Sequence, residues 1–147
     1  MFRKLIQTDA DRVATLLRLT LGLVIFPHGA QKALGLFGGY GFAGTMGFFT
    51  GQMHIPALFA FLAIAAEFAG SLGLISGALT RVAAFGVFCN MLVATVLVHW
   101  KVGFFMNWYG SQQGEGYEYH LLAMGLAVAV MIRGGGAASV DRALSRR

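Results

Sequence analysis

Residues 56–79 read PALFAFLAIAAEFAGSLGLISGAL and carry one ionisable side chain, Glu67. As an α-helix, a run of this length crosses the ~30 Å hydrocarbon core of a bilayer. An ionised carboxylate is costly in hydrocarbon, so this side chain must face protein, water or a ligand, or else be protonated. The segment therefore predicts a transmembrane helix, and Glu67 is its first candidate functional residue.

The rest of the chain repeats this apolar pattern. Hydrophobic residues make up 57% of the sequence and charged residues only 12%, whereas a soluble domain carries about 25% charged residues. We predict an all-α integral membrane four-helix bundle formed by one domain, residues 1–147, with a lipid bilayer around it. The predicted spans are about 12–32, 56–79, 82–100 and 117–133. Thr8, with Asp11 three residues later, resembles a capping box and is expected to start the first helix.

Residues 34–54 connect the first two spans and are too rich in glycine to cross a membrane. Apolar side chains nevertheless recur there at helical spacing, at Phe42, Met46, Phe49 and Met53. Such spacing is typical of an amphipathic helix that lies along the membrane surface. We therefore expect a short interfacial helix between spans 1 and 2.

The lysines and arginines between the spans predict the orientation. Both termini fall on the side with Arg3, Lys4, Arg12, Arg81, Arg133, Arg142, Arg146 and Arg147, whereas the other side holds only Lys32 and Lys101. Basic residues accumulate on the cytoplasmic side of membrane proteins, so both termini are expected to be cytoplasmic. The net charge of +5 thus indicates topology and gives no reason to expect nucleic-acid binding.

Helix geometry predicts that Glu67 and Asn90 lie at the same depth. Glu67 follows Pro56 by eleven residues, roughly 16 Å, and Asn90 precedes His99 by nine, roughly 14 Å. An inward-facing Glu67 is favoured because small residues share its helical stripe. We expect an acid that exchanges protons, with Asn90 orienting a ligand carbonyl; the alternative is a protonated Glu67 bonded only to Asn90 or Ser71.

Several polar residues fall at the predicted outer ends of the spans. Of these, His28 and His120 are candidates for proton relays, because neutral imidazole both donates and accepts a proton. Lys32 is a candidate for holding an anionic co-substrate. The remaining candidates for ligand binding are Gln31, His99, Trp100 and Glu118.

Three imidazoles and a carboxylate also raise the question of a metal or haem. No helix carries an HxxxH or ExxH spacing, so a metal or haem is the less favoured alternative to a quinone, and no metal ligands are assigned. Cys89 is the only cysteine, which excludes a dithiol redox pair. Outer-side aromatic residues fit an interfacial belt, or a ring-lined cleft suited to a quinone.

Five motifs resemble one family across nearly the whole chain. They are HGAQKALGLFGGYG, AAEFAGSLGLISGALTR, VHWKVGFFMNW, GEGYEYHLL and ASVDRAL, and they are similar to the DoxX family of bacterial membrane proteins. The resemblance implies a bacterial inner-membrane protein linked to quinones or oxidative stress, since DoxX proteins resemble a subunit of thiosulfate:quinone oxidoreductase. The matching polar positions are His28, Gln31, Lys32, Glu67, His99, Glu118 and His120, with no catalytic role attached to them.

These observations favour a membrane oxidoreductase component that handles a quinone in an outward-facing intramembrane pocket. The sequence lacks flavin, nicotinamide and iron–sulfur motifs, so electrons would come from a substrate or a redox partner protein. The sequence leaves open whether the chain is itself an enzyme. Two other classes remain: a non-enzymatic scaffold or assembly subunit for a redox partner, and a small-molecule carrier. A homo-oligomer is compatible with each class.

Overall fold

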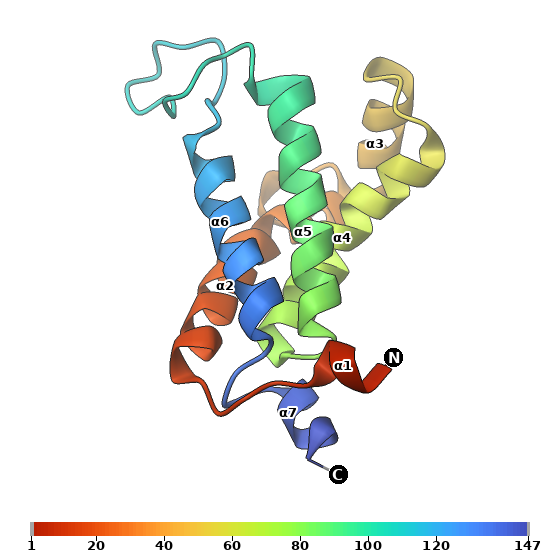
Figure 1. The fold of residues 1–147 in the computed structure, drawn as a ribbon. Helices are drawn as coiled ribbons and strands as arrows, with labels where there is room; N and C mark the ends of the chain where they lie inside the picture. The colour runs from red at the N-terminus through yellow and green to blue at the C-terminus, as the bar shows by residue number, and fades with distance from the viewer. Residues whose placement is uncertain (1, 147) are drawn as a thin grey trace.

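The computed structural model describes residues 2–146, which form helices joined by turns and loops (Figure 1). The long helices are α2 (Arg12–Leu34), α4 (Ala57–Ser76), α5 (Thr80–Ala94) and α6 (Glu118–Arg133). The short ones are α1 (Phe2–Ile6), α3 (Gly41–Gly47) and α7 (Val140–Ser145). Single turns complete the set: η1 (Leu36–Gly38), η2 (Phe48–Gln52) and η3 (Thr95–His99).

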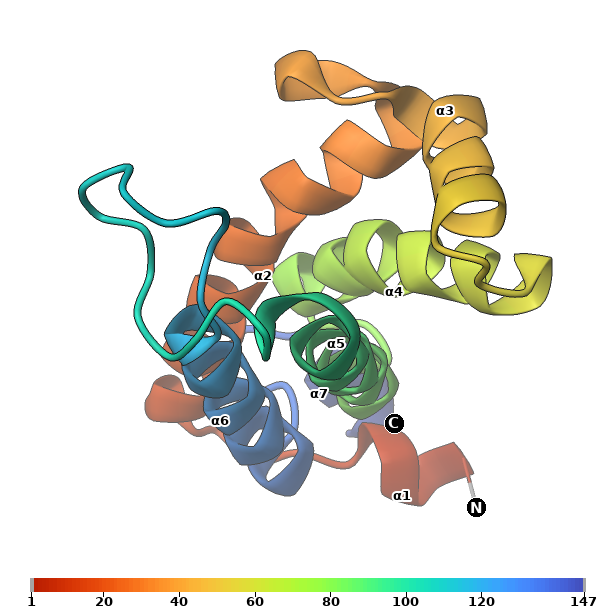
Figure 2. The same cartoon turned by 90° about the horizontal axis from the view of Figure 1, so that it is seen from above.

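The four long helices pack around a common apolar core. Both α2 and α5 contact α4 and α6, an arrangement visible along the helix ends in Figure 2. The core includes the fully buried Leu21, Ile25, Leu74, Val87 and Val130. Large apolar side chains also cover the outer surface of these helices, as expected for helices that face lipid.

Three helices are long and apolar enough to cross a membrane: Arg12–Leu34, Ala57–Ser76 and Thr80–His99. They lie where the first three spans are predicted. Helix α6 has 16 residues, fewer than the ~20 that a bilayer requires of an untilted helix. The chain is therefore an all-helical protein with three candidate spans, and the crossing by α6 remains a prediction.

Helix α2 begins at a different cap from the predicted one. The sequence indicates a capping box that starts at Thr8, but Asp11 is the N-cap and accepts hydrogen bonds from the Val13 and Ala14 amides at 2.8 and 3.1 Å. Thr8 Oγ1 instead donates to the Arg133 carbonyl and accepts from the Gly136 amide. A contact distant in sequence thus takes up the hydroxyl that local spacing assigns to the cap.

The termini meet at one end of the bundle, opposite the long α5–α6 connection (Figure 1). There, Asp141 of α7 accepts hydrogen bonds from the Leu79 and Thr80 amides, each at 2.8 Å. These bonds satisfy amides at the start of α5, which has no helix partner for them. The tail is therefore part of the folded core and holds the α4–α5 hairpin closed.

Arg18, inside the first predicted span, is only 1% exposed and serves the same end of the molecule. Its guanidinium donates to the Gly135, Ala138 and Ile75 carbonyls at 2.9, 2.6 and 2.7 Å, and also to Leu74. A buried cation is tolerated where hydrogen bonds replace its water. Arg18 thus anchors the C-terminal end of α4 to the tail.

Candidate functional site: a buried carboxylate held by three helices

Glu67 is the central polar residue of the bundle interior and is 4% exposed. Its Oε2 lies 2.6 Å from Lys32 Nζ of α2. Its Oε1 accepts a hydrogen bond from Asn90 Nδ2 of α5 at 2.7 Å. Glu67 and Asn90 lie level with each other, as the spacing predicts. One carboxylate therefore joins α2, α4 and α5, and we call these three residues the carboxylate centre.

The close approach of α2 and α4 explains how Lys32 reaches Glu67. A Cβ added at Gly29 would lie 2.6 Å from backbone atoms of Glu67 and Phe68. No side chain fits there, so the two backbones touch, as helices with small interface residues do in membranes. Lys32 follows Gly29 by one helical turn and shares its face. The close approach at Gly29 thus places the Lys32 ammonium group beside the Glu67 carboxylate.

Protein groups contact both oxygens of the Glu67 carboxyl group. Both oxygens have a partner, and one partner is a cation at ion-pair distance, which offsets the cost of removing the charge from water. Ser71 contributes nothing to it, because Ser71 Oγ donates to the Phe68 carbonyl. The Lys32 side chain is 27% exposed, so the centre is not completely enclosed by protein.

A row of rings leads away from this centre. The His28 and Tyr119 rings lie 6.1 Å apart, Tyr119 and His120 lie 5.4 Å apart, and His120 and His99 lie 4.0 Å apart. His99 Nδ1 ends the row at 2.7 Å from the Glu115 carbonyl oxygen, in the outer loop. His28 precedes Lys32 by one helical turn on α2, so the other end of the row lies next to the carboxylate centre. The row therefore joins the carboxylate centre to the loop between α5 and α6.

Two polar atoms of this row have no hydrogen-bond partner among residues 2–146. They are the Tyr119 hydroxyl and His120 Nδ1, and both are buried. Buried polar groups almost always have a partner, so such atoms call for a ligand or water. The sequence places Tyr119 only among the outer aromatic residues. Its position directly before His120 is the signal that could have singled it out.

The other predicted ligand-binding residues fix the outer turns. Gln31 donates to the Phe37 carbonyl at 3.1 Å. Glu118 accepts from the Met106 amide and from Trp108 Nε1 at 2.9 and 3.0 Å. Trp100 stacks on the Tyr117 ring at 5.3 Å. Of the predicted site residues, the structure thus brings Lys32, Glu67 and Asn90 together. His28, His120 and His99 lie in the row of rings that includes Tyr119. Gln31, Trp100 and Glu118 belong to neither group.

The histidines do not assemble a metal site in the described part of the chain. No group of three or more His, Cys, Asp or Glu side chains there has the spacing to hold a metal ion. The His99 and His120 rings are instead in direct contact, with their centroids 4.0 Å apart.

Apolar helices enclosing a charged, hydrogen-bonded interior define a helical membrane protein. Residues 13–100, more than half of the chain, match the sequence model of the DoxX family. The protein therefore belongs to the DoxX family, as its motifs predict. The matched region contains the whole carboxylate centre, whereas Tyr119 and His120 follow it. Comparisons with curated proteins and with solved structures give no significant match.

Proposed function

We propose that this protein is a quinone-linked component of a membrane redox system. The quinone ring would bind between the carboxylate centre and the row of rings formed by His28, Tyr119, His120 and His99. The observation that carries the proposal is the buried Glu67 carboxylate, held by Lys32 and Asn90, together with two unpartnered polar atoms, the Tyr119 hydroxyl and His120 Nδ1. Family membership supports a membrane role associated with oxidoreductases.

We further infer a four-span arrangement in the bacterial inner membrane with both termini cytoplasmic. Helix α6 packs along α2 and α5, and a short apolar helix spans a bilayer when a terminal arginine, here Arg133, reaches back to the surface. Helix α3 and the turn η2 stand beside the α2 and α4 ends in both views and would form the interfacial segment (Figures 1 and 2). The basic residues at the terminal end support the orientation.

The donor groups of the site fit a quinone ring. A quinone presents two carbonyl oxygens, which only accept hydrogen bonds. The Tyr119 hydroxyl is a buried donor without an acceptor among the described residues. Lys32 retains N–H groups beyond the one that faces Glu67, because an ammonium carries three. Phe26 and Phe68, stacked at 6.2 Å, add apolar ring surface next to the centre.

The residues of the site are arranged to move protons. A quinone, when bound, supplies two-electron chemistry in which its conversion to the quinol also takes up two protons. Glu67 holds a proton-accepting carboxylate, and Lys32 holds a proton-donating ammonium. His28 and His120 exchange protons with the outer loop, since each imidazole can donate from one nitrogen and accept at the other. Asn90 fixes the orientation of the Glu67 carboxylate.

Electrons reach such a site from outside the chain. The sequence has a single cysteine and no flavin or nicotinamide motif. We therefore propose a soluble redox protein as the electron donor, docking at the outer loop. The proposed function is thus that of a subunit: the chain supplies the ligand site and the protons, and the partner supplies the electrons.

Reaction-induced infrared spectroscopy tests the proton role. Decylubiquinone is added to the protein in lipid nanodiscs and reduced with dithionite, and the difference spectrum is recorded in the carboxyl region. The unmodified protein should show a carboxyl signal that Glu67→Gln removes and that the matched control Asp9→Asn, an exposed carboxylate at the opposite end, retains. An identical spectrum in Glu67→Gln would exclude Glu67 from proton exchange.

A non-enzymatic scaffold is the second candidate. It is favoured by the saturation of Glu67, since both carboxylate oxygens already have protein partners. In that case Glu67 serves only to join three helices. Stable co-purification of a partner protein, together with no binding of decylubiquinone to the unmodified chain, would favour the scaffold over the quinone site.

A further inference from the structure

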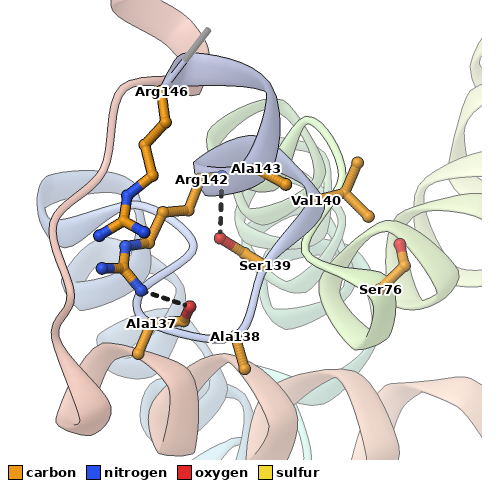
Figure 3. A pocket seen from close by; sticks show the side chains of 8 residues that line it. All are labelled: Ser76, Ala137, Ala138, Ser139, Val140, Arg142, Ala143 and Arg146. Carbon is orange, nitrogen blue, oxygen red and sulfur yellow. Dashed lines mark hydrogen bonds between the residues drawn. The ribbon is translucent and has the colours of Figure 1, made fainter.

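A pocket of about 480 Å³ opens at the terminal end of the bundle, far from the carboxylate centre. It is lined by Ser76 at the end of α4, by residues 137–140 of the tail and by one side of α7 (Figure 3). The quinone proposal makes no use of this pocket.

Two arginines form one wall of the pocket. Arg142 lies in α7 and Arg146 is the C-cap residue four positions later, and Figure 3 shows their guanidinium groups turned to the same side. Neither has a carboxylate within ion-pair distance among residues 2–146. Asp141, the acid on the same helix, turns instead to the Leu79 and Thr80 amides. Like charges at this spacing repel each other, and an anion between them would remove that cost.

The two guanidinium groups are the donors that the pocket offers. Ser76 Oγ is occupied by the Leu72 carbonyl and Ser139 Oγ by the Gly136 carbonyl. Arg142 donates one N–H to the Ala137 carbonyl at 2.9 Å, which leaves its other N–H groups for a ligand. Arginine binds phosphate through parallel N–H groups. An oxyanion with several acceptor oxygens, such as a phosphate, therefore matches the wall.

The opposite side of α7 is apolar. Val140, which also lines the pocket, is 42% exposed, and Leu144 one turn later is 49% exposed. A helix with basic and apolar sides is typical of the membrane surface, where the basic side meets lipid phosphates and the apolar side meets acyl chains. The combination of a basic side and an apolar side favours a lipid as the ligand, because a small soluble anion would leave the apolar side in water.

We propose that this pocket binds the phosphate of an anionic phospholipid. Arg142 and Arg146 contact the phosphate, while Val140 and Leu144 lie against the acyl chains. The site stands independently of the quinone site, because the two share no residue. It would hold α7, and through Asp141 the α4–α5 hairpin, at the surface of the membrane.

The test measures the thermal stabilisation of the full-length protein in detergent as lipid is added. The probes are dioleoylphosphatidylglycerol, dioleoylphosphatidylcholine and inorganic phosphate. Arg146→Gln is the main variant, because Figure 3 marks no hydrogen bond between Arg146 and the other residues that line the pocket. Arg3→Gln is the control, since it removes an exposed charge outside the pocket.

Phosphatidylglycerol should raise the melting temperature, and Arg146→Gln should need roughly five times more of it for half the effect, as expected for one basic residue. Arg3→Gln should match the unmodified protein. Equal stabilisation by phosphatidylcholine, or equal loss in both variants, would overturn the site. The same stabilisation by inorganic phosphate alone would overturn the assignment to a lipid.

Discussion

A double-mutant cycle on Lys32 and Glu67 examines the geometry on which the proposed function depends. The perturbations are Lys32→Met, Glu67→Leu and the two combined. Both changes remove charge while keeping an apolar side chain of similar length in the bundle. The lost hydrogen bond between Asn90 and Glu67 is common to the single and the double variant, so the cycle cancels it.

The structure sets the expected magnitude. Two unit charges 2.6 Å apart attract with about 6 kcal/mol at an effective dielectric constant of ~20. Desolvation offsets most of this attraction, yet removing one partner of a fully buried pair costs about 3–5 kcal/mol. Lys32 is 27% exposed and can turn toward water, which lowers the cost. We therefore predict a coupling energy of about 2 kcal/mol, since an exposed pair yields only about 0.2–1 kcal/mol.

The assay is reversible unfolding in mixed micelles, with the free energy of unfolding followed by circular dichroism as the denaturing detergent increases. A control cycle uses Arg133→Gln and Asp11→Asn, because Arg133 and Asp11 form a longer and less buried pair, 3.4 Å apart with side chains 67% and 23% exposed. Asparagine still caps α2, so the control reports the ion pair alone. A Lys32–Glu67 coupling no larger than that of the control would refute a desolvated ion pair.

Substitutions at Gly29 and Asp141 test two contacts that hold the helices together. Gly29→Ala should destabilise the protein by about 2 kcal/mol in the same unfolding assay, because its Cβ meets the α4 backbone. Gly125→Ala, where an added Cβ meets nothing within 4 Å, is its control, and equal effects would contradict the close approach. Asp141→Ala should cost about 2 kcal/mol by leaving the Leu79 and Thr80 amides without their acceptor. Asp141→Asn should lower the free energy of unfolding by less. If Asp141→Ala is as stable as the unmodified protein, the proposed role of the tail is contradicted.

Residues 56–79 show what could be predicted from the sequence. A long apolar run with one charge specifies a membrane helix and directs the charged side chain into the protein. Counting 1.5 Å per residue also placed Asn90 at the level of Glu67. Both predictions depend on local geometry within single helices. The DoxX resemblance likewise depends on motifs read directly from the sequence, and the match over residues 13–100 confirms it.

The contacts between helices could not be predicted in the same way. The sequence predicts that Lys32 holds an anionic co-substrate but does not reveal its pairing with Glu67, which depends on the close approach of α2 and α4 at Gly29. The Thr8 cap was wrong because its hydroxyl bonds to the tail, more than a hundred residues away. Pairings of this kind arise from tertiary packing, which the spacing of residues along one helix does not encode.

Retention of quinone through mild purification tests the central claim most directly. Lipid extracts of the protein and of Tyr119→Phe, which loses only the unpartnered hydroxyl, are analysed by mass spectrometry for quinone per mole of protein. The account predicts close to one quinone in the unmodified protein and several-fold less in Tyr119→Phe. No quinone in the unmodified protein, or equal amounts in both, would contradict it.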